Sequence, residues 1–190
     1  KKIAAFCPVG AIGTSPLAID LGKCVFCGEC AFAFPEKISF TPDHVISTNL
    51  RERLIVKEGD ELPVRTDRDA VRPEVKRICG RSLKLREISA AGDNSAEWEM
   101  NACGNVQFDM SRFGIEFVAS PKHADGILIT GPISENMAKA VEICHEAAAD
   151  PQIIILAGTD AISGGIFKES NALQRSFIKK HQIDLYIPGN

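Results

Sequence analysis

Three cysteines separated by two residues each constrain this chain more than any other feature of its sequence. Cys24, Cys27 and Cys30 form the pattern C-x2-C-x2-C, and Phe34 and Pro35 follow it. A bacterial iron–sulfur run has the form C-x2-C-x2-C-x3-C-P, so Phe34 stands where such a run has its fourth cysteine. A tight loop with this spacing points three thiolates to one side, as a [4Fe–4S] cube requires. The spacing therefore predicts a cluster whose fourth ligand comes from another part of the chain.

Cys7, which precedes a proline, is the expected fourth ligand. The segment 7–12 reads C-P-x-G-A-I and resembles the tail that follows a cluster ligand in bacterial ferredoxins. The front of the chain resembles half of such a ferredoxin together with the last ligand of the other half. We therefore expect one [4Fe–4S] cluster, held by Cys7, Cys24, Cys27 and Cys30.

Two alternatives for these cysteines are a structural zinc site and free thiols. Zinc ligands more often come as two separated pairs, whereas three thiols at successive steps of three residues favour the iron–sulfur cube. Apolar neighbours such as Phe6, Phe26 and Phe32 would exclude water from a cluster, but they would equally form a small core.

Composition excludes several classes of function. Of the 190 residues 45% are hydrophobic and 25% charged, which is ordinary for a globular protein. The net charge is −3 and the basic residues are scattered, so we expect no nucleic-acid partner. No apolar run is long enough to cross a bilayer. Four of the seven cysteines lie near the start of the chain at metal-ligand spacing, which favours a reducing, cytoplasmic location over disulfides.

The pattern along the chain predicts three parts. Residues 1–45 form a small α+β ferredoxin-like module, in which 17–20 and 38–41 alternate as strands do. Residues 46–80 are charged and contain two prolines, so they are expected to form an extended linker. Residues 81–190 form the larger domain.

In the larger domain, strands alternate with helices. Residues 153–156 are the most apolar strand, as in the centre of a parallel sheet, and polar caps precede helices near 95 and 135. This alternation predicts an α/β fold with a flavodoxin-like, doubly wound parallel sheet, whose functional loops follow the carboxyl ends of the strands. The predicted strands are 83–89, 115–119, 126–130, 153–156 and 183–187.

The second half also resembles a known family. The run 112–132, which begins R-F-G-I-E-F-V-A-S-P, is similar to the small subunit of energy-converting (group 4) [NiFe] hydrogenases and to the cluster-carrying twenty-kilodalton subunit of respiratory complex I. The segments 164–167 (G-G-I-F) and 186–189 (Y-I-P-G) match two further signatures. The resemblance covers about residues 80–190.

This resemblance implies partners and a location. The expected partner is of the [NiFe] hydrogenase large-subunit type, which corresponds to the forty-nine-kilodalton subunit of complex I. The resemblance also implies association with membrane subunits through the complex, and a peripheral position at the inner face of the membrane.

The resemblance further implies a proximal [4Fe–4S] cluster, but its ligand positions are substituted here. Carboxylates suit hard cations rather than iron–sulfur clusters, so we expect the proximal cluster to be absent. The vacated loops could close, fill with water or hold a hard cation on two carboxylates, which are more often solvated or capping groups. The remaining Cys79, Cys103 and Cys144 do not match ligand positions. The substituted positions are Asp93, Ala96, Asp160 and Asn190.

Glu97 matches a family glutamate and is a possible proton relay. It is equally expected as a favourable negative charge in the first turn of a helix.

The sequence thus predicts an iron–sulfur electron-transfer subunit that is not itself catalytic. The alternative is a non-redox scaffold or binding module whose emptied cleft holds a small anion or a hard metal ion. A third possibility, a subunit with an intact proximal cluster, conflicts with the substituted ligands.

Overall fold

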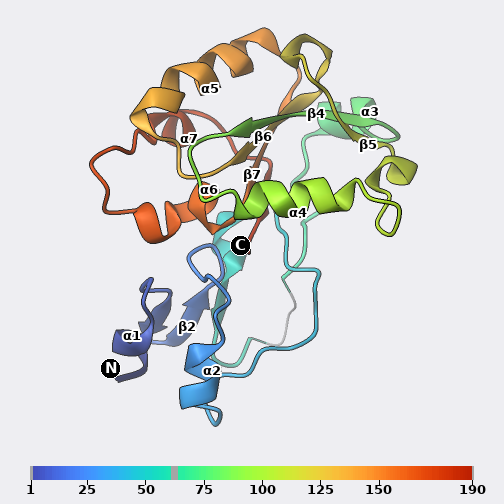
Figure 1. The fold of residues 1–190 in the computed structure, drawn as a ribbon. Helices are drawn as coiled ribbons and strands as arrows, with labels where there is room; N and C mark the ends of the chain where they lie inside the picture. Colours follow the sequence, from blue (N-terminus) through green and yellow to red (C-terminus); the bar gives the residue numbers. More distant parts are fainter. Residues whose placement is uncertain (1, 61–63, 190) are drawn as a thin grey trace.

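The computed structural model describes residues 2–60 and 64–189, and its larger part is a five-stranded parallel sheet (Figure 1). The strand order is β5-β4-β6-β7-β8, and every neighbouring pair is parallel. Along the chain this is the order 2-1-3-4-5 of flavodoxin-like sheets, so the predicted α/β fold class is confirmed. The strands are β4 (Leu83–Ser89), β5 (Ile115–Phe117), β6 (Gly126–Thr130), β7 (Ile153–Ala157) and β8 (Leu185–Ile187).

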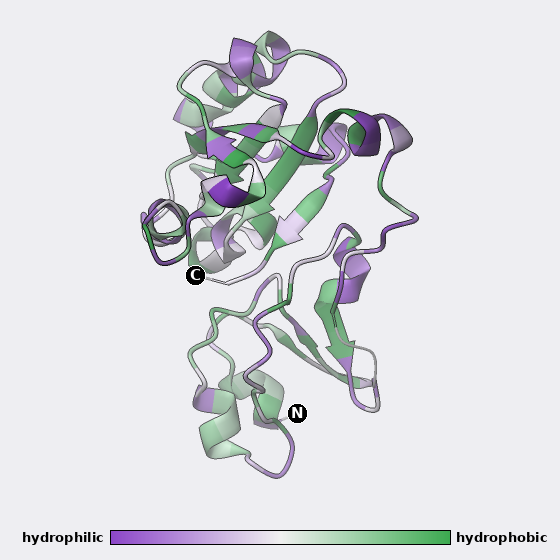
Figure 2. Ribbon diagram, turned by 90° about the vertical axis from the view of Figure 1, so that its right-hand side faces the viewer, coloured by the Kyte–Doolittle hydropathy of each residue, from purple (hydrophilic) through white to green (hydrophobic). Residues whose placement is uncertain are grey.

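Helices cover both faces of this sheet. β6 and β7 are buried along their whole length because their apolar side chains face helices on both sides. Figure 2 shows these strands as hydrophobic ribbons beneath helices that carry hydrophilic segments. One face carries α5 (Glu135–Ala147), α6 (Thr159–Ser163) and α7 (Ser176–Lys180), and the other carries α3 (Pro73–Ile78) and α4 (Ser95–Cys103).

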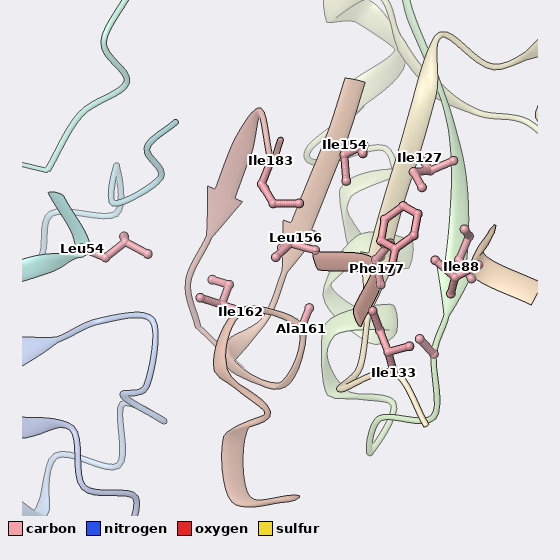
Figure 3. Packing of buried hydrophobic residues seen from close by; sticks show 13 residues of the cluster. Leu54, Ile88, Ile127, Ile133, Ile154, Leu156, Ala161, Ile162, Phe177 and Ile183 are labelled. Atoms are coloured by element: carbon pink, nitrogen blue, oxygen red, sulfur yellow. The ribbon is translucent and has the colours of Figure 1, made fainter. Parts of the chain in front are cut away.

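The α5 side holds the larger core, built around Phe177 and the inward-facing isoleucines of three strands (Figure 3). The α4 side holds a smaller cluster in which Met100 of α4 and Val75 of α3 pack against the sheet. Short 3-10 turns complete this part: η2 (Met110–Phe113), η3 (Pro121–His123) and η4 (Gly165–Phe167).

The front of the chain forms a second, antiparallel sheet of order β1-β2-β3. The strand predicted at 17–20 is confirmed as β2, but the strand predicted at 38–41 is wrong. β3 pairs with β2 instead, and its Val56 lies opposite Ile19. The elements are α1 (Lys2–Phe6), β1 (Ile12–Thr14), β2 (Leu17–Asp20), α2 (Glu29–Ala33), η1 (Arg51–Leu54) and β3 (Ile55–Lys57).

The segment between the two sheets contacts both of them. Thr48 forms a two-way backbone bridge with Tyr186 of β8, with N···O distances of 3.1 and 2.8 Å. Leu54 of η1 is fully buried in the core on the α5 side (Figure 3). The segment expected as an extended linker therefore helps to join the small sheet to the large one.

No helix in the described ranges is both long and apolar enough to cross a membrane.

Candidate functional site

The four predicted cluster ligands lie around one small cavity. Cys7 follows α1, Cys24 precedes the loop, and Cys30 lies in the first turn of α2. Between them the backbone turns sharply, because Phe26 and Gly28 adopt left-handed conformations with φ of 51° and 75°. Cys7, Cys24, Cys27 and Cys30 all line the same cavity of about 20 Å³. The structure thus places around one cavity the three cysteines of the C-x2-C-x2-C run and Cys7, the expected fourth ligand.

Backbone amides and burial set the properties of these thiols. The N–H of Ala11 donates to Cys7 Sγ at 3.3 Å, and the N–H of Phe26 donates to Cys24 Sγ at 3.4 Å. Burial raises the pKa of the Cys24 and Cys30 thiols, and the neighbouring cysteines raise both pKa values further. The thiolate forms therefore disfavour one another until a positive metal centre compensates their charge.

The donor set suits soft metals. Among the described residues that line this cavity there are four thiols and a single carboxylate, that of Glu29, and thiolates select iron–sulfur clusters. The side chains are not arranged as a preformed metal centre, since residues 2–60 and 64–189 contain no group of three His, Cys, Asp or Glu side chains placed to hold a metal ion. The chemistry of the donors fits an iron–sulfur cluster, which the thiols would have to converge to bind.

Three of the substituted positions, Asp93, Ala96 and Asp160, lie at the carboxyl edge of the parallel sheet. Asp93 is exposed before α4, and its Oδ1 accepts a hydrogen bond from the backbone N–H of Ser95 at 3.0 Å. Ala96 is buried in α4, and Asp160 is buried in α6. Asn190 lies outside the described residues.

Asp160 is the most perturbed group at this edge. Its Oδ2 is buried without a hydrogen-bond partner among the described residues, and the close approach of Gly165 leaves no room for a side chain beside its Oδ1. Burial, and then the negative charges of Asp93 and Glu97, raise the pKa of Asp160 to about 6, against the opposing effect of Arg175. A fraction of Asp160 is therefore protonated near neutral pH.

Glu97 is buried against the sheet and accepts two hydrogen bonds that sequence reasoning missed. Ser89 Oγ donates to Glu97 Oε1 at 2.6 Å, and Thr130 Oγ1 donates to the same oxygen at 2.7 Å. Burial, followed by the charge of Glu97, raises the pKa of nearby Glu87. The alternation of β4 places Glu87 and Ser89 on one face, and this could have suggested a polar row next to α4.

A mostly apolar cavity of about 390 Å³ lies between the cysteine loop and this edge. Phe26 approaches it from the cysteine loop, and Glu99 is the one charged residue among the described residues that line it. The cavity is lined by Phe26, Ile46, Ala96, Glu99, Met100, Cys103, Ala157, Gly158, Ile187, Pro188 and Gly189.

Comparison with known proteins places the second half in a family. The family model for "NADH ubiquinone oxidoreductase, 20 Kd subunit" matches residues 94–190. The probable membrane-bound hydrogenase subunit mbhJ of Pyrococcus furiosus is 28% identical over 127 residues, which are 65% of this chain and 76% of that protein. An NADH-quinone oxidoreductase subunit from Bacteroides fragilis is 39% identical over 111 residues, which are 58% of this chain and 56% of the relative.

A solved structure also matches. A chain of the membrane-bound sulfane sulfur reductase, an archaeal respiratory membrane complex, aligns with a TM-score of 0.49 and 27% identity, covering 58% of this chain and 60% of the other. The family model spans slightly more than half of the 190 residues. The chain therefore belongs to the family of the 20 Kd subunit of NADH ubiquinone oxidoreductase.

Proposed function

We propose that this chain is an electron-transfer subunit of a membrane-associated oxidoreductase related to hydrogenases or to complex I. It carries one [4Fe–4S] cluster on Cys7, Cys24, Cys27 and Cys30 and lacks the proximal cluster. The observation that carries this proposal is the shared cavity of four cysteines beside the carboxyl edge of the parallel sheet. The names of the relatives, a membrane-bound hydrogenase subunit and a quinone oxidoreductase subunit, support the type of complex.

The cluster would store one electron. The residues around it would influence its potential and its contact with water. The amides of Ala11 and Phe26 point at two of the sulfurs, and hydrogen bonds to sulfur are one of the factors that set the potential of such clusters. Phe6 and Phe34 stack edge to face with ring centroids 5.7 Å apart, and the ring centroid of Phe40 lies 6.1 Å from that of Phe26. Phe6 and Phe40 line the cysteine cavity and would limit the access of water to it.

The two sheets are proposed to have different functions. We propose that residues 1–45 are a ferredoxin-like module, that 46–80 connect it, and that 81–190 serve as the docking domain. The absence of the proximal cluster is inferred from the side chains at Asp93, Ala96 and Asp160, none of which is a thiol.

Exposed apolar side chains on and after α4 support the proposal that a protein partner binds near the carboxyl edge of the parallel sheet. Trp98 is 71% exposed and Phe108 is 61% exposed, and Val106 and Phe113 lie between and beyond them on the same segment. Exposed apolar side chains mark an interaction surface where they form one continuous patch, and we propose that these do. We propose a homologue of the [NiFe] hydrogenase large subunit, or of its forty-nine-kilodalton counterpart in complex I, as this partner. The whole would take a cytoplasmic, peripheral position at the inner membrane face, and Glu97 would relay protons at the interface.

Counting iron and acid-labile sulfide in the anaerobically purified chain tests the proposal. We expect about four irons and four sulfides per chain. Cys7→Ser should lose the cluster, whereas Cys144→Ser in α5 serves as a matched control that keeps it. About eight irons would overturn the absence of the proximal cluster, and one zinc without iron would overturn the cluster itself.

Counting iron and sulfide also distinguishes the proposed electron-transfer subunit from the alternative, a non-redox binding module. The unpartnered carboxylate oxygen of Asp160 favours this alternative, because a hard cation or a proton could satisfy it. A chain without iron that binds Mg²⁺ or Ca²⁺, and loses the binding in Asp160→Asn, would support that function instead.

A further inference from the structure

The cysteine loop contacts α6 of the larger domain through one buried side-chain hydrogen bond. Thr159 Oγ1 donates to the backbone carbonyl of Cys24 at 2.9 Å, and Thr159 is fully buried. The backbone N–H of Thr159 donates in turn to the carbonyl of Gly189 at 3.1 Å, so the threonine is fixed from both sides. Cys24 is thereby held by a residue at the carboxyl edge of the parallel sheet.

Close backbone packing reinforces this contact. Gly22 lies two residues before Cys24, and a Cβ built there would stand 2.8 Å from Cγ2 of Ile162 in α6. Only a residue without a side chain allows such an approach. The start of the loop therefore lies directly against α6.

A second contact holds the turn after Cys7. Lys168, which follows η4, donates from Nζ to the carbonyl of Val9 at 3.1 Å. Val9 is buried, and it lies between Cys7 and Ala11, the residue whose N–H donates to Cys7 Sγ. A Cβ built on Gly10 would be 3.5 Å from the same ammonium group. The ammonium therefore lies over the turn that presents Cys7.

The charge of Lys168 has no carboxylate partner in the part of the chain that the structure describes. Among residues 2–60 and 64–189 the salt bridges within 4.0 Å do not include Lys168. The side chain of Lys168 is exposed, so dissolved salt weakens the effect of its charge. Its ammonium group nevertheless stays next to the turn after Cys7 through the hydrogen bond to Val9.

We propose that Thr159 and Lys168 are positioning residues for the cluster site: Thr159 fixes the Cys24 side, and Lys168 fixes the Cys7 side and places a positive charge beside it. This inference rests on the proposed [4Fe–4S] cluster. A cluster on four thiolates is negatively charged and becomes more so on reduction, so a nearby cation favours the reduced state. Residues that orient metal ligands typically change metal affinity about 10- to 100-fold when they are removed.

The test uses the anaerobically reconstituted full chain and two pairs of variants. Lys168→Met should lower the midpoint potential of the cluster in an EPR-monitored titration, by a shift that shrinks as ionic strength rises. Lys168→Arg should keep the wild-type potential, because it preserves the charge. Thr159→Val should release iron to a chelator about ten times faster than wild type. Thr159→Ser should stay close to wild type, because it preserves the hydroxyl.

Lys139→Met, an exposed lysine on α5, controls for a general change in charge. Amide hydrogen exchange of β6 and β7 in each variant shows whether the larger domain stays folded. A change in potential or iron release can then be distinguished from unfolding of the domain. An unchanged potential in Lys168→Met, or unchanged iron release in Thr159→Val, would overturn the role of that residue while leaving the proposed function intact. Wild-type chain that binds no iron would overturn both.

Discussion

Arg72 and Asp184 form a bidentate ion pair that connects the segment 46–80 to the parallel sheet. Arg72 Nε lies 2.9 Å from Asp184 Oδ1, and Arg72 Nη2 lies 3.0 Å from Oδ2. Asp184 Oδ2 also accepts the N–H of Ile154 at 2.9 Å. Because both side chains are partly buried, Arg72→Met should lower the free energy of unfolding by about 2 kcal/mol. Urea unfolding of the full chain measures this loss.

A second ion pair from the same connecting segment provides the matched control. Arg53 lies 2.8 Å from Asp67, but the Arg53 side chain is 44% exposed. Solvent screens such pairs, so Arg53→Met should lower the free energy of unfolding by less than ~1 kcal/mol. Equal losses in the two variants would contradict the special role of the Arg72 pair.

Leu54 joins the two sheets through apolar contact. It is fully buried in the core on the α5 side although it belongs to η1, next to the small sheet. Leu54→Ala should therefore lower the free energy of unfolding by about 3 kcal/mol, because it leaves a cavity between the two parts. The neighbouring Ile55 is 38% exposed, and Ile55→Ala should change the free energy of unfolding much less. A small effect of Leu54→Ala in the same urea assay would mean that the parts do not stabilise each other.

The parallel sheet could be predicted from sequence because its signal is local. The predicted ranges 83–89 and 126–130 coincide with β4 and β6, because alternation marks the first strand and a run of apolar residues marks the second. The pairing of β3 with β2 and the buried position of Leu54 could not be predicted, because the partners are distant in sequence. The strand expected at 38–41 failed for the same reason: alternation shows that a segment could form a strand, but not whether a neighbouring edge is free.

In the candidate site, too, local features could be predicted from the sequence and long-range contacts could not. The spacing of cysteines 24, 27 and 30 predicted a cluster-binding loop, and the structure places the three side chains around one cavity together with Cys7. The partners Ser89 and Thr130 of Glu97, like Thr159 and Lys168, lie on separate elements. No local pattern marks a hydrogen bond that forms only after the sheet and the loop have met. Such contacts have to be found in the structure.

Glu97 should be structurally important through its acceptor oxygen rather than through its charge. Glu97→Ala leaves the hydroxyl of the fully buried Thr130 with only the longer contact to the Ile88 carbonyl, at 3.4 Å, and should lower the free energy of unfolding by about 2 kcal/mol. Glu97→Gln keeps a carbonyl acceptor and should cost less than ~1 kcal/mol. If thermal and urea unfolding agree with this difference, a loss of turnover in the assembled complex of Glu97→Gln would report on proton transfer. Equal destabilisation by both variants would contradict the assigned role of the oxygen.

Asp160 should make the protein less stable as the pH rises from about 4 to about 6. The pKa of Asp160 is raised from 3.8 to about 6 by burial first, and then by Asp93 and Glu97. In this window the folded chain holds a proton that the unfolded chain has released, so the contribution of this group to stability falls and then stays level above pH 6. The shift corresponds to at most ~3 kcal/mol. Asp160→Asn should remove this pH dependence and unfold at higher urea than wild type at pH 7.

Asp93 offers the control of opposite sign. Hydrogen bonds from the side chain and the backbone N–H of Ser95 lower the pKa of Asp93, so its own contribution to stability increases with pH below its ordinary pKa. Asp93→Asn removes that contribution, and it also removes a negative charge that raises the pKa of Asp160. The upper end of the window of falling stability should then move to lower pH, while its lower end stays at the ordinary pKa. If Asp160→Asn and wild type show the same dependence of the urea midpoint on pH, the carboxyl is not held protonated in the folded chain. A cation or a water molecule would then have to satisfy Asp160 Oδ2.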